Sequence, residues 1–217
     1  MRRRVYVCSS MRLAVSYKMK DIYAHLVKDP VMKKLVEKYG RLEETWEVRD
    51  TFSSIVHEII GQQLSGKAAD TIEGRFKSLL RQTDPLSPEE ILLIDDEMFR
   101  HKAGISYAKI AYIKGLSKAV IDKTFDLARI ETLSDEEALA ELTALKGIGP
   151  WTAEMLLMFT FRRPDIFSLG DAGLRKAISV LYRIERNDEK AILDLSAGWK
   201  PYRSYAARYL WRSLDNE

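Results

Sequence analysis

The sequence predicts an all-helical protein, and three observations carry this prediction. Apolar residues recur at the 3.6-residue spacing of a helix, most clearly over residues 51–65. Ser-Pro-Glu-Glu at 87–90 and Ser-Asp-Glu-Glu at 134–137 are start signals typical of helices. Patterns typical of β-strands are nearly absent, and glycine or proline separates the short periodic segments. We therefore expect a globule of many short helices.

The helix over residues 51–65 is the first strong element. Its apolar residues fall on one stripe, which a soluble helix turns toward a core. The polar pair Gln62 and Gln63 comes at the end of this otherwise apolar stretch, where we expect the helix to end. The stripe consists of Phe52, Ile55, Val56, Ile59, Ile60 and, after Gly61, Leu64.

Two later helices begin at recognisable caps. Ser87 is a candidate N-cap, Pro88 suits the first helical position, and Glu90 completes a capping box. A helix is therefore expected over 88–94. The same signal at Ser134 begins an amphipathic helix, whose apolar residues are Ala138, Leu139, Leu142 and Leu145.

Composition excludes several classes of protein. With 46% hydrophobic and 31% charged residues, the chain is neither a disordered protein nor a membrane protein. The single cysteine, Cys8, excludes a disulfide framework, a structural zinc site and a cysteine-ligated iron–sulfur cluster. The net charge of +3 is too small to identify a nucleic-acid-binding protein by itself.

The N-terminal residues start with a basic run, as secretory signal peptides do. Arg12 and Lys18 interrupt the apolar residues that follow, so we expect a protein that is not secreted. The expected location is the cytoplasm, or the nucleus in a eukaryotic cell.

The most informative stretch is 142–159, LTALKGIGPWTAEMLLMF. A helix that ends at Lys146 is followed by the turn of Gly147 and Gly149, two residues that allow positive φ angles. Pro150 suits the start of the next helix, and the amides from Gly149 to Thr152 are then suited to a phosphate oxygen. On this motif alone, an ordinary helix end followed by a proline-started helix is the favoured interpretation.

Asp171 is the second signal, 22 residues after Gly149 in PDIFSLGDAGLRK. It comes just before an apolar-periodic helix, so a plain N-cap explains it when it is considered alone. The functional interpretation is a carboxylate held by the helix dipole beside a cleft. The spacing between the glycine turn and Asp171 favours the functional interpretation.

With both motifs in place, the chain resembles the helix–hairpin–helix DNA glycosylases, in which an essential aspartate follows the hairpin. GIGPWTA is similar to the branch that removes alkylated bases (3-methyladenine type). The stretches IIGQQLSGKAADTI, GISYAKIAYI and WKPYRSYAARYLW extend the resemblance over roughly residues 20–212. It implies an enzyme that flips alkylated purines out of double-stranded DNA and hydrolyses the N-glycosidic bond. No organic cofactor is expected, and a monomer is the expected state.

The resemblance also implies a monofunctional enzyme that leaves an intact abasic site. In the bifunctional members, a lysine stands at the second residue after the hairpin's last glycine. That residue is Trp151 here, and Lys146 lies before the hairpin. Two alternatives stay open: a glycosylase for deaminated or etheno-adduct bases, and a non-catalytic helix–hairpin–helix DNA-binding module.

The resemblance assigns roles to individual residues. Asp171 is the expected catalytic carboxylate, Trp151 and Tyr202 are expected in the base pocket, and Gln63 is the expected wedge with Leu64 as the alternative. We expect the other C-terminal aromatic residues, Trp199, Tyr205, Tyr209 and Trp211, in the core. The phosphate contacts are expected mainly from the hairpin amides, at Gly147 and Gly149, with the Thr152 hydroxyl as a further donor. The carbonyls of Leu145 and Gly147 would hold a monovalent cation, K⁺ or Na⁺, and no side-chain metal site is expected.

Two helical lobes with an active-site cleft between them are expected. One is the central lobe of residues 51–159, which ends in the hairpin, and the other joins residues 1–50 to 160–217. Five basic residues are candidates for positive charge near the cleft, although sequence does not separate them from ordinary surface residues: Lys67, Lys109, Lys114, Arg175 and Lys176.

Overall fold

The computed structural model describes residues 21–42 and 50–214 and confirms the all-helical prediction. Within these ranges the regular elements are helices, and pairing of the β type is limited to a bridge between Thr83 and Leu86. The N-terminal residues on which the argument about export rests lie outside the described ranges. None of the described helices is both long and apolar enough to cross a membrane.

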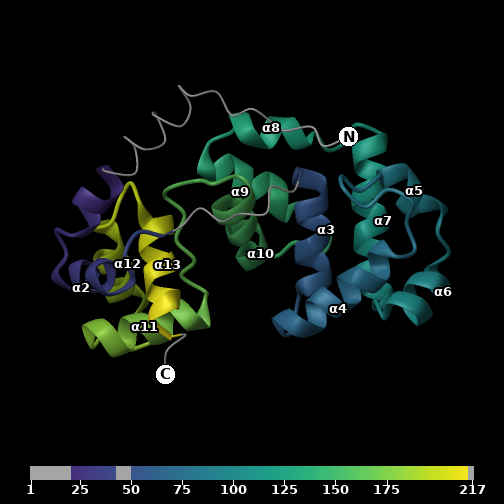
Figure 1. Cartoon of the computed structure of the whole chain (residues 1–217). Helices are drawn as coiled ribbons and strands as arrows, with labels where there is room; N and C mark the ends of the chain where they lie inside the picture. Colours follow the sequence, from purple (N-terminus) through teal and green to yellow (C-terminus); the bar gives the residue numbers. More distant parts are fainter. Residues whose placement is uncertain (1–20, 43–49, 215–217) are drawn as a thin grey trace, which may run out of the picture. The chain divides into compact units, whose positions relative to one another are not determined.

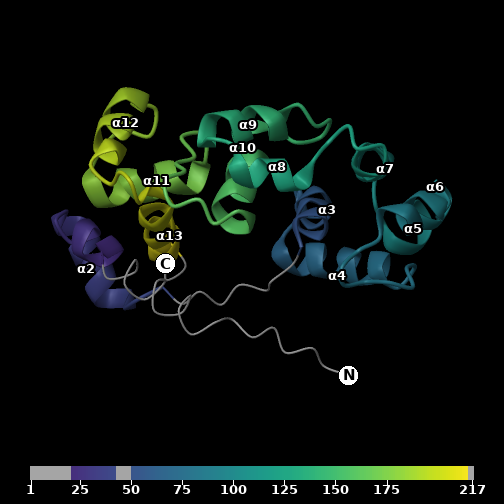
Figure 2. The same cartoon turned by 90° about the horizontal axis from the view of Figure 1, so that it is seen from above.

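Contacts between residues divide the chain into two compact units. The first comprises Met1–Glu44 and Pro164–Glu217, and the second comprises Thr45–Arg163. The first unit has a helical segment at 21–26 and then α2 (Pro30–Tyr39), α11 (Ala172–Tyr182), α12 (Glu189–Ala197) and α13 (Arg203–Leu214). Helices α2 and α13 come from opposite ends of the chain and pack against each other (Figures 1 and 2). This unit is therefore built from two distant parts of the sequence.

The core of the first unit is formed around large aromatic side chains. Trp199 and Tyr209 are fully buried there, as expected from the sequence. Asp29 connects the two parts of the unit, because its Oδ2 accepts hydrogen bonds from the Tyr182 hydroxyl (2.9 Å) and from Trp199 Nε1 (3.0 Å). Its Oδ1 caps α2 by accepting from the Val31 amide at 2.7 Å.

The second unit contains the remaining helices. They are α3 (Thr51–Gly61), α4 (Gly66–Lys77), α5 (Pro88–Leu93), α6 (Asp96–Met98), the π-helix η1 (Phe99–Ala103), α7 (Tyr107–Ile121), α8 (Leu127–Thr132), α9 (Asp135–Thr143), α10 (Pro150–Met155) and the π-helix η2 (Leu156–Thr160). The apolar stripe of α3 is buried as predicted, from Phe52 to Ile60. Phe76 of α4 stacks on Phe99 with ring centroids 5.2 Å apart. The helix that carries the stripe is therefore part of the core of this unit.

The two predicted N-caps are confirmed, but the capping box predicted at Ser87 is not formed, because the Glu90 carboxylate accepts from the amides of Arg81 (2.6 Å) and Gln82 (3.0 Å) instead. Ser87 caps α5 by accepting from the Glu90 amide, and Pro88 takes the first helical position. Ser134 and Glu137 form a reciprocal capping box at the start of α9. The bond from the Ser134 amide lowers the pKa of Glu137 below its usual value, because it favours the ionised carboxylate.

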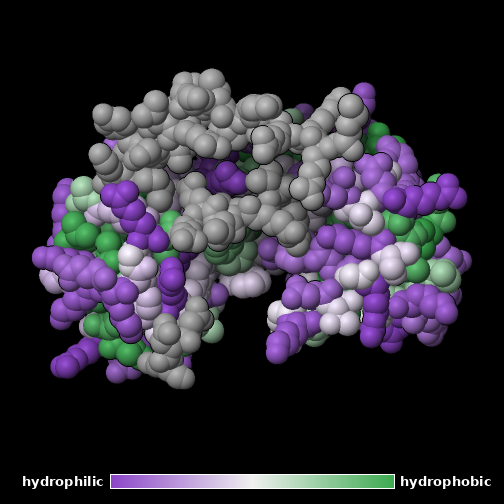
Figure 3. Space-filling view, viewed as in Figure 1, coloured by the Kyte–Doolittle hydropathy of each residue, from purple (hydrophilic) through white to green (hydrophobic). Residues whose placement is uncertain are grey.

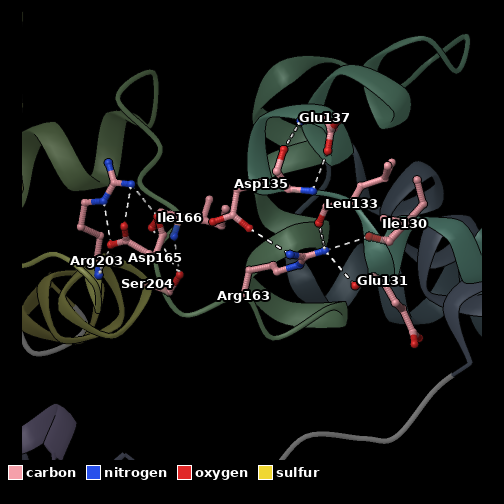
Figure 4. Close-up of polar contacts among 11 residues, drawn as sticks. Ile130, Glu131, Leu133, Asp135, Glu137, Arg163, Asp165, Ile166, Arg203 and Ser204 are labelled. Atoms are coloured by element: carbon pink, nitrogen blue, oxygen red, sulfur yellow. Dashed lines mark hydrogen bonds and ion pairs between the residues drawn. The ribbon is translucent and has the colours of Figure 1, made fainter.

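The chain passes from the second unit to the first at Arg163 and Pro164, and each side of this passage is anchored in its own unit (Figure 4). In the first unit, Arg203 binds both carboxylate oxygens of Asp165, at 2.8 and 3.0 Å. Ser204 Oγ accepts from the Ile166 amide at 2.9 Å. In the second unit, the Arg163 guanidinium donates to the carbonyls of Ile130, Glu131 and Leu133 and to the carboxylate of Asp135.

The face shown in Figure 3 is mainly hydrophilic, with hydrophobic surface in a few separate areas. One of these areas lies over α5, where Leu92 and Leu93 are exposed. Single exposed apolar residues of this kind are usual on the surface of folded proteins.

Candidate active site

The hairpin predicted from Gly147 and Gly149 joins α9 to α10, and its two glycines differ. Helix α9 ends at Thr143, three residues before the predicted end. Gly147 has a φ of +94°, and a Cβ added there would lie 2.3 Å from the ring of Tyr112 on α7. Gly149 has an ordinary φ of −84°, and an added Cβ would meet nothing within 4 Å. The positive φ angle is therefore found at Gly147 only, where packing also requires glycine.

The start of α10 has the form expected of a phosphate-binding helix end. Gly149 is the N-cap and contributes no side chain, and Pro150 occupies the first turn as predicted. Backbone amides at a helix start without a side-chain cap are suited to an anion. Trp151 follows with 46% of its surface exposed.

Thr152 is buried rather than exposed, with 5% of its surface accessible. Its hydroxyl accepts a hydrogen bond from Gln62 Nε2 at 3.3 Å. The same Gln62 nitrogen donates to the Gly147 carbonyl at 2.9 Å. The side chain of Thr152 therefore faces the end of α3, which leaves its backbone amide as the group suited to a phosphate.

The segment predicted to carry the wedge separates into an inward and an outward residue. Helix α3 ends at Gly61, and Gln62 turns its side chain to the hairpin. Gln63 is exposed and has a φ of +58°, in the left-handed region that glutamine rarely adopts. Leu64 is 37% exposed. The expectation that Leu64 completes the buried stripe is therefore wrong, because the helix ends before this residue.

Among the basic candidates, Lys109, Lys114 and Arg175 have structural partners within their units. Lys109 donates to the carbonyls of Ile60 and Gln62. Lys114 binds the Ile94 carbonyl at 2.7 Å and pairs with Asp96. Arg175 donates to the carbonyls of Leu169 and Arg186 and to the carboxylate of Glu189. These three groups hold loops and helix ends.

Asp171 is both an N-cap and the acceptor of a distant side chain. Its Oδ1 accepts from the Leu174 amide at 2.7 Å at the start of α11 and from Trp211 Nε1 of α13 at 2.8 Å. Gly173 permits this approach, because a Cβ there would lie 3.1 Å from Asp171 Oδ1 and 3.2 Å from Trp211 Nε1. The two N–H donors fix the orientation of the carboxylate.

The loop that leads to Asp171 is held along its length by the first unit. The first turn of α13 holds its beginning through Arg203 and Ser204, and Trp211 of the same helix holds its end. Arg175 of α11 holds the middle by donating from Nε to the Leu169 carbonyl at 2.7 Å. Helices α11 and α13 therefore position Asp171 on a rigid support.

Two of the aromatic residues expected in the core are not fully buried. Tyr205 and Trp211 are only partly buried, and Trp211 bonds Asp171. The glycine two residues after Asp171 is the sequence signal that points to such a close approach. Tyr202 lies just before α13 and packs edge-on against the ring of His25, with centroids 5.5 Å apart. It is nine residues from Trp211, about 13 Å along a helix.

The two carbonyls expected to hold a monovalent cation each accept a hydrogen bond within the protein. The Leu145 carbonyl accepts from the Ile148 amide at 3.0 Å, and the Gly147 carbonyl accepts from Gln62. Each carbonyl oxygen keeps a second lone pair, so the cation site stays a prediction. The described residues also contain no group of three or more His, Cys, Asp or Glu side chains placed for a metal ion.

Comparison with known proteins finds relatives for most of the chain. Residues 56–201 match the family model of the HhH-GPD superfamily base excision DNA repair proteins. DNA-3-methyladenine glycosylase 1 of Schizosaccharomyces pombe is 35% identical over 189 residues, which is 85% of this chain and 82% of that protein. A putative DNA-3-methyladenine glycosylase of Bacillus subtilis is also 35% identical, over 72% of this chain and 56% of its own length.

Solved structures agree with the sequence comparison. The S. pombe 3-methyladenine DNA glycosylase in complex with abasic DNA superposes with a TM-score of 0.79 and 34% identity, covering 90% of this chain and 97% of the other. A DNA-3-methyladenine glycosidase of Bacillus halodurans gives a TM-score of 0.77 and 33% identity, with 88% of each chain covered. The family model and these relatives thus cover most of the chain, and this chain belongs to the HhH-GPD superfamily of base excision DNA repair proteins.

Proposed function

We propose that the protein is a monofunctional DNA glycosylase that removes alkylated purines of the 3-methyladenine type from duplex DNA and leaves an abasic site. The observation that carries the proposal is Asp171, a carboxylate oriented by two N–H donors at the position where the superfamily has its essential aspartate. The names of the relatives support the choice of lesion. DNA bound to the S. pombe relative supports the choice of partner.

The chemistry requires a negative group near the sugar. Breaking the N-glycosidic bond builds positive charge on the sugar ring, as in other glycoside hydrolyses. The carboxylate of Asp171 stabilises this charge and orients the water that attacks C1′. An alkylated purine already carries a positive charge, so it departs with little help from a general acid. One carboxylate is therefore sufficient for this substrate class.

The residue at position 151 argues for glycosylase activity without strand cleavage. A bifunctional enzyme needs an amine that attacks the sugar and forms a Schiff base. Trp151 occupies the position where such enzymes carry lysine. Its exposed ring is suited to stacking on an extruded base, which contributes roughly 1–3 kcal/mol per base.

DNA binding is assigned to the second unit. Extruding a base costs a few kcal/mol, which contacts to the distorted duplex must offset. The backbone amides of Gly147, Gly149 and Thr152 bind phosphate oxygens in this proposal, and Gln63 fills the space left by the base. The exposed position of Gln63 supports it as the wedge, with Leu64 beside it as the alternative.

The test compares the wild type with Asp171→Asn on a methylated DNA duplex. We expect free 3-methyladenine from the wild type, with a strand that is cut only after alkali treatment. Asp171→Asn should slow release by roughly a hundredfold or more, because a preorganised charge is lost at the transition state. Chromatography of released bases and gel analysis of the strand measure both effects.

Asp188→Asn is the matched control, since Asp188 caps α12 in the same unit by accepting from the Ala191 amide at 3.0 Å. Asparagine caps helices as well as aspartate does, so this variant should keep full activity. Equal rates for wild type and Asp171→Asn would show that another carboxylate acts. Duplex binding without release of any base would favour a non-catalytic module.

A further inference from the structure

The short segment that carries Gln63 and Leu64 combines a strained backbone with hydrogen bonds to two other elements. We name residues 62–64 the wedge turn. Gln63 has a φ of +58°, a conformation that is unfavourable for a residue with a side chain. Such conformations persist only where surrounding contacts enforce them, and they concentrate at functional positions. The contacts that hold Gln62 and the end of α3 therefore indicate a functional role for this segment.

Lys109 of α7 supplies one set of these contacts. Its ammonium donates to the carbonyls of Ile60 at 2.8 Å and Gln62 at 2.7 Å, one before and one within the wedge turn. Both partners are neutral oxygens at the C-terminal end of α3, where a positive charge is favourable. Burial lowers the pKa of Lys109 below its usual value, because the ammonium is removed from water.

Gln62 supplies the second set, toward the hairpin. Its Nε2 donates to the Gly147 carbonyl at 2.9 Å and to Thr152 Oγ1 at 3.3 Å, across 85 and 90 residues of sequence. The backbone of Gln62 is thus held by Lys109 while its side chain holds the hairpin. Gln62 of the wedge turn therefore binds both Lys109 of helix α7 and the hairpin.

We infer that Lys109 and Gln62 form a clamp that positions the wedge residue Gln63 relative to the phosphate-binding hairpin. The inference rests on the proposed function, because it gives the wedge turn a role in DNA binding. Lys109 and Gln62 are positioning residues here: they act on DNA through Gln63, whose position relative to the hairpin they fix. With the clamp in place, the wedge enters the duplex without first losing conformational freedom, which lowers the entropic cost of binding.

Lys114 provides a matched control on the same helix. Its ammonium also donates to a carbonyl near a helix end, that of Ile94, and it pairs with Asp96. Removing either ammonium with methionine deletes the same kind of contact and keeps a similar apolar stem. The contacts of Lys109 involve the wedge turn, whereas those of Lys114 involve the segment between α5 and α6.

The probe is a duplex with a tetrahydrofuran abasic-site analogue and 2-aminopurine opposite it, so that fluorescence reports insertion of the wedge. We expect Lys109→Met to weaken binding about tenfold and to reduce the fluorescence change, since bonds from a charged donor are lost. Lys109→Arg should restore most of the affinity, because its guanidinium also donates to two carbonyls. Lys114→Met should bind like the wild type. Gln62→Leu tests the other half of the clamp and should reproduce the effect of Lys109→Met.

A double-mutant cycle separates positioning of the wedge from general loss of stability. If Lys109 acts through Gln63, adding Lys109→Met to Gln63→Ala should change the affinity by less than about twofold. Multiplicative effects of these two substitutions, or equal losses in Lys109→Met and Lys114→Met, would overturn the inference. A wild-type protein that binds the abasic duplex but excises no base would contradict the proposed activity alone, whereas one that does not bind this duplex would contradict both.

Discussion

Asp171 depends on Trp211, a residue 40 positions away in the sequence. A helix N-cap was predictable from the local pattern around Asp171, because capping involves neighbouring residues only. The hydrogen bond from the Trp211 indole N–H was not predictable, since the spacing of the aromatic residues in α13 is equally typical of core residues. Gly173 is the one local signal of this approach, and its meaning is clear only when the position of Trp211 is known.

Trp211→Phe tests this pairing at the scale of single residues. The substitution keeps an aromatic ring and removes the hydrogen bond to Asp171, while the bond from the Leu174 amide remains. A hydrogen bond to a charged group is worth about 1.5–3 kcal/mol, so we expect single-turnover excision to slow by roughly tenfold or more. Affinity for an abasic duplex should change little. An unchanged excision rate would mean that the bond from Trp211 is not needed to orient the carboxylate.

At the scale of elements, helix starts were easier to predict than helix ends. The caps of α5 and α9 lie where Ser87 and Ser134 predicted them, because the capping residues bond within three positions of themselves. The ends of α3 and α9 fall before the predicted residues. The end of α3 has a partner distant in sequence, Lys109, whose ammonium binds the carbonyls of Ile60 and Gln62, and a local pattern does not contain this contact.

The hairpin gives a second prediction: substitution of Gly147 should lower the stability of the protein, whereas substitution of Gly149 should weaken DNA binding. Gly147→Ala places a Cβ against Tyr112 in a backbone conformation unfavourable for alanine, so we expect a loss of about 3 kcal/mol in the free energy of unfolding. Gly149→Ala should leave stability nearly unchanged, because its φ is ordinary and an added Cβ meets nothing. Urea unfolding measures both.

Binding to an abasic duplex then discriminates between the roles of the two glycines. The Cβ of Gly149→Ala would stand at the helix start that we assign to phosphate, so this variant should bind more weakly although it is fully folded. If Gly149→Ala binds like the wild type, the phosphate does not approach the backbone at this residue.

At the scale of the whole molecule, the family and the all-helical fold followed from the combination of motifs, since each motif alone had an ordinary structural explanation. What the sequence did not reveal is how residues 21–42 join the C-terminal helices in one unit. That connection depends on polar contacts spanning more than 150 residues, including those of Asp29 with Tyr182 and Trp199 and that of the Tyr209 hydroxyl with the Gly40 carbonyl.

Asp29→Asn tests whether this carboxylate holds the discontinuous unit together. The amide oxygen can still cap α2, but its NH₂ group would then face the Trp199 indole N–H, which is buried and can only donate. A buried donor without an acceptor costs about 1–3 kcal/mol, so we expect a loss of about 2 kcal/mol in the free energy of unfolding. Asp188→Asn, at the cap of α12, makes the same chemical change where the carboxylate acts only as a cap, and it should change stability by less than about 0.5 kcal/mol. Equal losses in the two variants would mean that Asp29 acts as an ordinary cap and that apolar packing of α2 on α13 holds the two parts of the unit together.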